Sequence, residues 1–343
     1  MKLGVKTRLI SFLLLLLSLF SLVSCADEVE DPKPQNRIFY DYFNTVSVLY
    51  DYSGMSAESF SSLASSVEAA MQHYHKLFDA YIEYSGVTNI ATLNRMGGKG
   101  AVKVPRELCE LLSFSLEMYE KTGGAVNFAM GAVTRLWKNL PASENRIPTD
   151  AELIEAAEHI SPYSVIIDRD NSTVEITDPD LLIDVGAIAK GYAAELLKKE
   201  IEAIGYSGIV LDMGGNLCAV GSKPSGKGWS SGIKNPLYPS ESSEPYSRTV
   251  TLNGDSLVTS GVYERYYVIG GVKYHHIIDP ETLRPENRYL SVTIQSPVSG
   301  VSDALSTAIF NMTPERAREF VSSYEGKLEV TLVFPDGSVE VLK

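Results

Sequence analysis

A short stretch near the middle of the chain combines an acid, small residues and a lysine. Asp184 stands two residues before Gly186-Ala187, and Lys190-Gly191 follow where we expect a helix to begin. Backbone approaches a phosphate closely only where side chains are small, and helix N-termini favour anions. A carboxylate, a bare backbone and an ammonium group within one turn therefore suit a nucleotide's diphosphate and its metal.

Two adjacent histidines offer a general base. His275 and His276 stand before an apolar pair and an Asp279-Pro280 turn. An unperturbed imidazole pKa of about 6.5 suits proton transfer near neutral pH. Neighbouring residues of a strand point to opposite faces, so at most one histidine faces a given site. The other is then solvent-exposed or structural.

A carboxylate and a hydroxyl recur at helical spacing near the C-terminal end. Asp303 and Thr307 are four residues apart, which places them on one face of a helix. Oxygen ligands of this kind suit a hard cation such as Mg²⁺. The simpler alternative is that Ser302 or Asp303 only caps the helix. A further motif, Gly214-Gly215 after a strand, indicates either close approach to a ligand or a tight turn.

Apolar periodicity and turn residues predict the elements that would position these residues. Helices are expected at Ser56–Tyr84, Pro105–Lys121, Thr149–His159, Ile188–Ile204, Ser302–Asn311 and Pro314–Ser323. Strands are expected at Tyr40–Tyr52, Val165–Asp168, Thr173–Asp178, Leu181–Val185, Ile209–Asp212, Leu217–Gly221, Trp229–Ile233, Arg248–Leu252, Ser256–Ser260, Tyr266–Ile269 and Leu290–Gln295. The mixed order, with a β-rich C-terminal half and flanking helices, predicts one large α+β domain.

The N-terminal segment has the features of an export signal. A basic start precedes the apolar run Ile10–Leu22, and small residues precede Cys25. The L-V-S-C ending resembles a bacterial lipobox, in which Cys25 becomes the lipid-modified N-terminus. We therefore expect a signal peptide at 1–24, a lipidated tether at 25–39 and a globular domain at 40–343.

Charge and cysteine content limit the possible partners. The formal net charge is −13, which argues against nucleic acid. Beyond Cys25, only Cys109 and Cys218 remain, both in apolar surroundings. We expect them to be buried free thiols.

The motifs DVGAIAKGY, LDMGGN, TSGVYERYY, HHIIDP and SDALSTA, in that order, closely resemble the ApbE family of FAD:protein FMN transferases. The earlier pieces TLNRM, GGAVN and LW agree with this resemblance, which covers residues from about 40 to 330. The resemblance implies a single ApbE/T-fold-like domain, and the lipoprotein signal fits the family.

The resemblance also implies roles for individual residues. The residues implied to contact FAD are Phe43, Tyr81, Ala125, Val126, Asn127, Asp184, Lys190 and Ile277. The implied Mg²⁺ ligands are the Ala187 carbonyl, Asp303 and Thr307, and the implied general base is His276. Two positions depart from the family pattern: Asn127 replaces an Asp, with no aromatic before it, and Ser306 replaces an often-present second Asp. With one carboxylate, Mg²⁺ is expected to bind mainly with the nucleotide.

The implied reaction is Mg²⁺-dependent transfer of FMN from FAD to a threonine hydroxyl, with release of AMP. The implied acceptor is an exported, membrane-associated flavoprotein, such as a subunit of the sodium-pumping NADH:quinone reductase or of the Rnf complex. Two alternatives remain: an FAD pyrophosphatase that yields FMN and AMP, and a non-catalytic flavin-binding lipoprotein. The expected location is a bacterial membrane, with the lipoprotein facing the periplasm.

Overall fold

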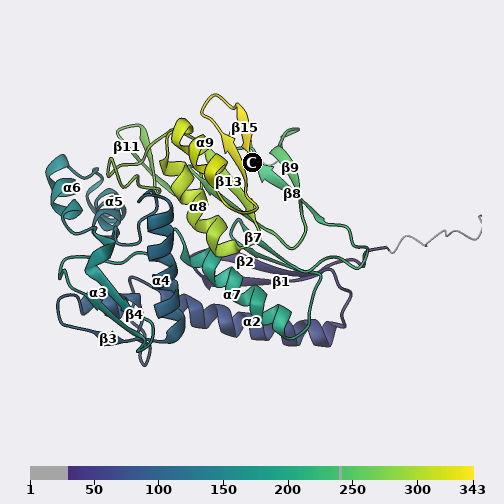
Figure 1. Ribbon diagram of the computed structural model, residues 1–343. Coiled ribbons are helices and arrows are strands. Elements are labelled where there is room, and N and C mark those ends of the chain that lie inside the picture. The colour runs from purple at the N-terminus through teal and green to yellow at the C-terminus, as the bar shows by residue number, and fades with distance from the viewer. Residues whose placement is uncertain (1–29, 239–241) are drawn as a thin grey trace, which may run out of the picture.

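The computed structural model of the protein describes residues 30–238 and 242–343 (Figure 1). The predicted signal peptide and Cys25 lie outside these residues. Within them, no helix combines the length and apolar character needed to cross a bilayer.

The largest element is an eight-stranded antiparallel sheet with the strand order β1-β2-β6-β7-β10-β13-β14-β15. Its strands are β1 (Gln35–Tyr42), β2 (Thr45–Asp51), β6 (Ile209–Met213), β7 (Asn216–Val220), β10 (Ser256–Gly261), β13 (Ser291–Ser296), β14 (Glu329–Val333) and β15 (Val339–Leu342). A tight turn at Gly214-Gly215 joins β6 to β7, with φ of +64° and +86°. This result confirms the turn interpretation of that motif.

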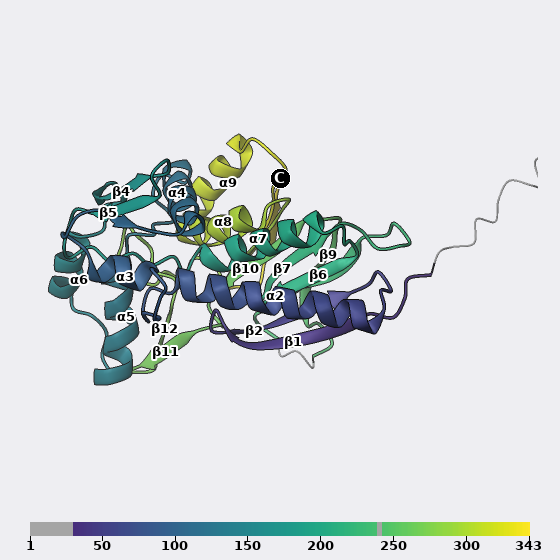
Figure 2. The same cartoon turned by 90° about the horizontal axis from the view of Figure 1, so that it is seen from below.

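Three helices cover one face of this sheet: α2 (Ala57–Phe78), α7 (Ala189–Ala203) and α8 (Ser299–Asn311). Alternation along the strands divides the apolar residues between two cores. In β6, for example, Leu211 belongs to the core under the helices, whereas Val210 packs with the β8 (Trp229–Lys234) and β9 (Tyr246–Leu252) ribbon on the other face. The view from below shows α2 and α7 running along the sheet (Figure 2).

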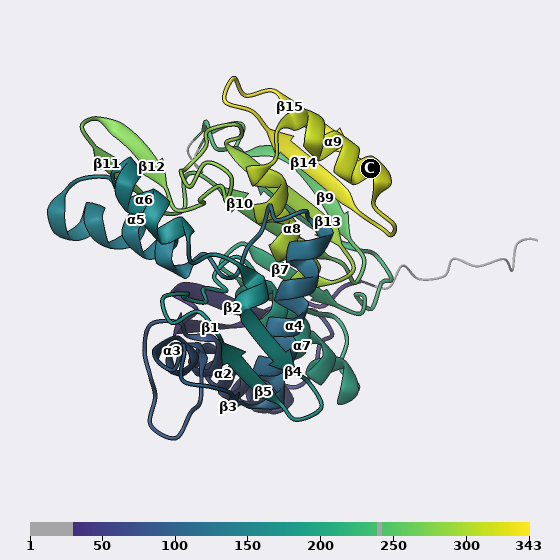
Figure 3. The ribbon, with the colours of Figure 1, turned by 60° about the vertical axis from the view of Figure 1, so that its left-hand side comes forward.

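The remaining elements gather at one end of the sheet (Figures 1 and 3). They are α3 (Ile90–Arg95), α4 (Arg106–Lys121), α5 (Gly131–Glu144), α6 (Asp150–Ala157), the 3₁₀ turn η1 (Pro162–Ser164), the sheet β3 (Val102–Lys103), β5 (Thr173–Ile176) and β4 (Val165–Asp168), and the hairpin β11 (Tyr266–Ile269) and β12 (Val272–His275). Helix α9 (Pro314–Ser323) follows α8. The predicted α+β class is confirmed.

Several predicted boundaries were wrong. The single strand expected over Tyr40–Tyr52 is two strands, because Phe43 and Asn44 turn the chain with φ of +53° each. Helix α2 begins at its Ser56 cap, as predicted, but ends at Phe78. The segment Leu181–Val185 makes one isolated bridge, between Leu182 and Met130, and is not a ladder strand.

Other elements were missed or start elsewhere. Helices α3 and α5 and strand β12 had no prediction, and β1 begins at Gln35, inside the segment expected to be a tether. Helix α8 begins at Ser299, so Asp303 lies in its second turn. The capping alternative for Ser302 or Asp303 is therefore wrong. Cys109 and Cys218 are buried free thiols, as expected.

Candidate functional site

Asp184 is the hub of the first part of the site. Its Oδ2 accepts hydrogen bonds from the hydroxyls of Tyr81 (2.8 Å) and Thr134 (3.1 Å), and its Oδ1 accepts one from the Gly186 N–H (2.9 Å). Three converging donors fix the carboxylate in one orientation. Thr134 was not predicted, and because it lies fifty residues from Asp184 only the fold could reveal the contact.

The segment before Asp184 is held in place without a regular strand. The Asn94 side chain imitates a strand partner, since it accepts from the Ile183 N–H (2.7 Å) and donates to the Ile183 carbonyl (2.9 Å). Gly131 lies against Leu182, where an added Cβ would fall 2.4 Å from the Leu182 carbonyl oxygen. These contacts explain why TLNRM, noticed in the sequence without a role, matters for the position of Asp184.

The Tyr81 ring is surrounded by positive charge. Lys138 Nζ lies 3.4 Å from the ring centroid and the Arg135 guanidinium carbon 5.4 Å from it. Desolvation, followed by the nearby Asp184 carboxylate, raises the pKa of Tyr81 above its ordinary value. The phenol is therefore a hydrogen-bond donor at neutral pH, and the cations from α5 make this edge of the site attractive to anions.

Asp303 joins helices α7 and α8 at the second part of the site. It is 3% exposed, its Oδ2 accepts from the Gly191 N–H (2.7 Å), and its Oδ1 lies 3.4 Å from Lys190 Nζ. The two helices approach so closely that a Cβ on Gly191 would lie 2.4 Å from both Asp303 Cβ and the Ser299 carbonyl oxygen. Gly191 is thus required for the contact.

We expect Gly191→Ala to destabilise the protein by about 1–3 kcal/mol, because the methyl group forces α7 away from α8. Urea unfolding of the full chain would measure the change. Gly300→Ala is the matched control, because its Cβ would meet neighbours at ordinary distances of 3.4 Å or more. Equal unfolding midpoints for the two variants would contradict the close-contact interpretation.

A chain of hydroxyls orients Thr307. Ser306 Oγ donates to the Asp303 carbonyl (2.8 Å), because a carbonyl oxygen only accepts. Ser260 must then donate to Ser306 (2.8 Å), and Thr307 must donate to Ser260 (3.3 Å). The Thr307 oxygen keeps its lone pairs for another partner, whereas buried Ser306 is committed to the protein.

The Ala187 carbonyl, just before α7, is left without a helical partner. A regular helix would pair it with the Gly191 N–H, but that N–H donates to Asp303 instead. Among the residues that the structure describes, no donor reaches the Ala187 oxygen. Carboxylate, hydroxyl and carbonyl oxygens are the ligand types that hard cations prefer.

The two histidines have different roles. His275 is buried; its Nε2 lies 3.0 Å from the Glu286 carbonyl and its Nδ1 accepts from the Ile277 N–H (3.3 Å), so it is structural. His276 is exposed, and its Nδ1 lies 3.2 Å from the Arg265 carbonyl. Because that carbonyl only accepts, Nδ1 carries the proton and Nε2 is left as a free acceptor. The structure confirms that only one histidine is available.

The charges around His276 favour its neutral form. Desolvation lowers the pKa of His276 to about 4, and the positive charges of Arg265 and Lys190 act in the same direction. At pH 7 the Nε2 atom can therefore accept a proton.

A hydrogen-bonded path runs from the Tyr81 segment to the β1–β2 turn. Asp79 Oδ1 accepts from the Tyr81 N–H (2.8 Å), and Asp79 Oδ2 accepts from the Tyr84 hydroxyl (2.9 Å). That hydroxyl lies 3.5 Å from His75 Nε2, and His75 Nδ1 accepts from the Phe43 N–H (3.2 Å). His75 thus connects the Tyr84 hydroxyl to the backbone of the β1–β2 turn.

The same path continues to the catalytic candidate. Arg265 donates from its guanidinium to the Asn44 carbonyl (3.3 Å), and its own carbonyl accepts from the His276 ring. The Phe43 ring lies edge-on to His75, with 5.7 Å between centroids. The β1–β2 turn, which contains Phe43, therefore links the Tyr81 segment to His276.

We expect Tyr84→Phe to weaken ligand binding at the Tyr81 segment about fivefold, since loss of one hydrogen bond costs about 1 kcal/mol. The turnover rate at saturating substrate should stay unchanged, because no reacting group is touched. Flavin fluorescence titration and steady-state rates would separate the two effects, with Tyr324→Phe as the control. An unchanged flavin affinity in Tyr84→Phe would show that the hydrogen bonds from Tyr84 do not position the Tyr81 segment.

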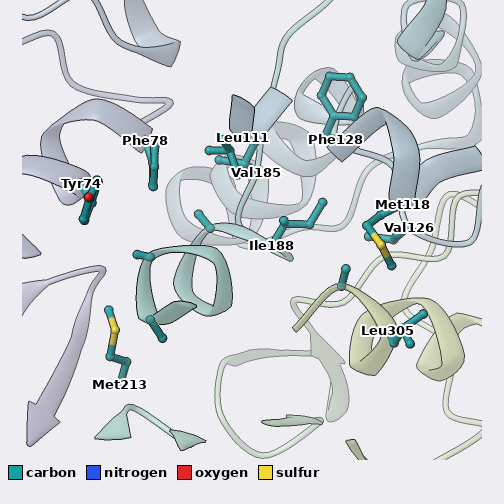
Figure 4. Packing of buried hydrophobic residues seen from close by; sticks show 14 of the residues in the cluster. Tyr74, Phe78, Leu111, Met118, Val126, Phe128, Val185, Ile188, Met213 and Leu305 are labelled. Carbon is teal, nitrogen blue, oxygen red and sulfur yellow. The ribbon is translucent and has the colours of Figure 1, made fainter. Parts of the chain in front are cut away.

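The predicted cofactor segment after Gly124 is largely inside the protein. Ala125 and Val126 are buried, and Figure 4 shows Val126 beside Met118 in the core. Asn127 donates to the Ile160 carbonyl (2.9 Å) and accepts from the Ala129 N–H (2.8 Å). An ionised Asp could not donate to the Ile160 carbonyl, so the Asn127 amide stabilises this turn in a way that Asp could not. Ile277 is also buried, next to His276.

Together these contacts define a class: a single α+β domain whose polar site gathers an acid hub, a lysine–aspartate contact between two helices and one free histidine. The sequence pattern described for the ApbE family matches residues 42–332, and the chain belongs to this family.

Relatives and solved structures agree with this assignment. A protein of Treponema pallidum (strain Nichols) named FAD:protein FMN transferase is 33% identical over 264 residues, which are 73% of this chain and 72% of that protein. A Klebsiella pneumoniae (strain 342) protein of the same name is 29% identical and covers 74% and 77% of the two chains. By these relatives the chain is a transferase.

The fold matches crystal structures over nearly its whole length. The ApbE protein from Thermotoga maritima superposes with a TM-score of 0.80 at 26% identity, covering 91% of this chain and 97% of that one. The apo form of the flavinyl transferase ApbE from Pseudomonas stutzeri gives a TM-score of 0.77 at 21% identity, covering 92% and 96%. At that identity the second comparison supports the fold alone.

Proposed function

We propose that this protein transfers FMN from FAD to a threonine hydroxyl of an acceptor protein and releases AMP. The observation that carries the proposal is the free Nε2 of His276, whose Nδ1 is held by the Arg265 carbonyl. A base at the edge of an anion-favouring site suits attack by a hydroxyl on a phosphate. The names of the relatives supply the two flavin nucleotides.

The oxygen set at α7 and α8 fits Mg²⁺. Asp303, Thr307 and the Ala187 carbonyl would hold the ion, since their atoms are hard donors and two of them lack a competing use of their lone pairs. When bound, Mg²⁺ would neutralise charge on the diphosphate. Ser306 is already committed to the Asp303 carbonyl, so the ion would have one carboxylate ligand from the protein.

The chain's own groups then have distinct tasks. Asp184 and Tyr81 would orient the nucleotide, and Lys190 would face its phosphates. His276 Nε2 would take the proton of the attacking threonine as the new phosphorus–oxygen bond forms and the bond to AMP breaks. The Arg265 carbonyl would hold the imidazole in the required tautomer. Most of the rate gain would come from positioning and charge.

The deciding experiment mixes the full-length protein, in detergent, with FAD, Mg²⁺ and a panel of exported flavoprotein domains. Intact-mass spectrometry follows the acceptor, and chromatography follows the free nucleotides. A gain of the FMN mass together with AMP supports the transferase. AMP and free FMN without a labelled acceptor would favour the pyrophosphatase, and intact bound FAD would favour a flavin-binding lipoprotein.

The proposed location is a bacterial membrane, with the domain facing the periplasm and tethered through lipid on Cys25. The support is the lipobox-like sequence alone. The acceptor would be a membrane-associated flavoprotein, such as a quinone reductase or Rnf-type subunit. We expect Cys25→Ala to move the protein from the membrane to the soluble fraction after cell lysis. Immunoblots of the two fractions would test this, and unchanged membrane retention would contradict it.

A further inference from the structure

The turn between β1 and β2 holds its backbone in a conformation that one of its residues rarely adopts. Phe43 and Asn44 both have φ of +53°, the left-handed pair that a two-residue hairpin turn requires. Asn tolerates this region, whereas a bulky residue such as Phe is strained there. Contacts outside the turn must therefore hold Phe43 in place.

His75 of α2 supplies such a contact. Its Nδ1 accepts from the Phe43 N–H (3.2 Å), and its ring lies edge-on to the rings of Phe43 and Tyr42, with 5.7 and 6.2 Å between centroids. Helix α2 packs against β1 and runs beside it (Figure 2). A side chain of one element thus holds the backbone of another at its strained residue.

The hydrogen bonds of the His75 ring are satisfied together in one neutral tautomer. Because Nδ1 accepts, the proton lies on Nε2, 3.5 Å from the Tyr84 hydroxyl. That hydroxyl donates to Asp79 Oδ2 (2.9 Å), so its oxygen is left to accept from Nε2. Burial lowers the pKa of His75 below its ordinary value; the Asp79 carboxylate opposes this shift and Lys76 adds to it. At neutral pH the ring is therefore uncharged, and Nδ1 remains an acceptor.

The same turn is joined to the candidate base on its other side. The Arg265 guanidinium donates to the Asn44 carbonyl (3.3 Å). The Arg265 carbonyl in turn accepts from the His276 N–H and from the His276 ring Nδ1, each at 3.2 Å. If the turn left its conformation, the Asn44 contact would be lost, and with it a restraint on the residue that orients His276.

Ring packing alone does not explain a histidine at this position. A phenyl ring could make the same edge-on contacts, but it has no acceptor for the N–H of half-buried Phe43. His73, two residues earlier in α2, provides a contrast. Its side chain is 51% exposed, and its Nε2 lies 3.7 Å from a Glu107 carboxylate oxygen on the surface. His75 is thus distinguished by its bond to strained backbone.

We propose that His75 is a positioning residue for transfer: its Nδ1 holds the strained β1–β2 turn, and the turn, through Arg265, holds the His276 ring in the tautomer that a base requires. The proposal rests on the proposed function, because it concerns the same base. Because Phe43 is strained, loss of the bond frees the turn to adopt another conformation. The effect is therefore expected in turnover, whereas Tyr84→Phe leaves Nδ1 in place and is expected to affect affinity.

The test compares substitutions of His75 in the full-length protein. His75→Phe keeps a ring but has no acceptor. His75→Asn places an amide oxygen as far along the side chain as Nδ1, whereas His75→Gln places it as far along as Nε2. His73→Phe is the matched control, since His73 lies in the same helix and its side chain is 51% exposed.

We expect His75→Phe and His75→Gln to lower the saturated rate of FMN transfer at least about fivefold, the scale of one lost hydrogen bond. The Michaelis constant for FAD should change less than about twofold, by the same reasoning. His75→Asn should keep most of the wild-type rate, and His73→Phe should keep all of it. A lower urea midpoint in His75→Phe with an unchanged rate would make His75 merely structural and overturn the proposal.

A second measurement reads the base without catalysis. The chain has five histidines, so long-range proton–nitrogen NMR of histidine-labelled protein shows few rings, and His276→Ala identifies the His276 signals. Wild type and His75→Asn should show His276 protonated on Nδ1, whereas His75→Phe should show exchange between both tautomers. The wild-type pattern in His75→Phe would contradict the proposal. Absence of transfer by every protein, wild type included, would count against the proposed function, and the tautomer would still decide the role of His75.

Discussion

Asp303→Asn is expected to reduce FMN transfer by at least about 100-fold, the usual scale for losing a group that stabilises charge at a reacting phosphate. Asparagine keeps the shape and an oxygen that can accept from the Gly191 N–H. It removes the negative charge that faces Lys190 and the one carboxylate of the proposed Mg²⁺ set. The loss should therefore appear mainly in catalysis and in the Mg²⁺ concentration required for it.

The control for this variant is Asp255→Asn. Asp255 is also buried and also faces a lysine, Lys327, at 2.7 Å, but it precedes β10 at the end of the strand away from Ser260. Both substitutions uncouple a buried carboxylate from a lysine, so both should lower the urea midpoint. Only Asp303→Asn should raise the Mg²⁺ requirement. Near-normal transfer by this variant, at ordinary Mg²⁺, would refute the assignment.

The two parts of the site depend on each other through the fold. Asp184 lies just before α7, Lys190 lies in its first turn, and Asp303 comes from α8. Gly191 allows the helices to meet, and the hydroxyl chain from Thr307 to the Asp303 carbonyl fixes the turn of α8 that carries both proposed ligands. A change in this packing should therefore disturb Lys190, Asp303 and Thr307 more than it disturbs His276.

Sequence pattern was sufficient for the parts of the site that are local in the chain. The acid, small residues and lysine before α7 share one short segment, and Asp303 and Thr307 share one helix face, so spacing alone placed them. The class of fold followed from the order of strands and helices. The two histidines were separated correctly because adjacent strand residues face opposite ways.

Contacts between distant segments could not be predicted in this way. Thr134 and Asn94 contact the Asp184 segment because α5 and α3 bring them there. Neither helix was predicted, since α3 is short and the apolar periodicity of α5 is weak. Arg265 holds the His276 ring through its backbone carbonyl, which any residue would supply, so this contact has no sequence signal. The turn at Phe43-Asn44 was missed because neither residue is a glycine, although Asn tolerates positive φ.

His276→Ala should lower transfer by about 100- to 10,000-fold, the usual contribution of a general base. Binding of FAD should change little, because the free Nε2 acts on the acceptor's hydroxyl. Added imidazole should restore part of the rate in the alanine variant, which a purely structural loss would not allow. Flavin titration, transfer rates and imidazole rescue would be measured together, and near-normal flavinylation of the acceptor would sink the assignment.

The pH dependence gives a second, independent check on the same residue. The pKa of His276 is lowered to about 4 by desolvation and neighbouring cations, so the native state resists protonation that the unfolded chain accepts near 6.5. Between these values the unfolded state binds more protons, and stability therefore falls as pH falls through that window. The base itself stays neutral there, so the acid limb of the transfer rate should lie well below 6.5. An acid limb at pH 6.5 or above in the wild type would show that the surroundings of His276 do not lower its pKa. An unchanged acid limb in the imidazole-rescued alanine variant would assign that limb to another group.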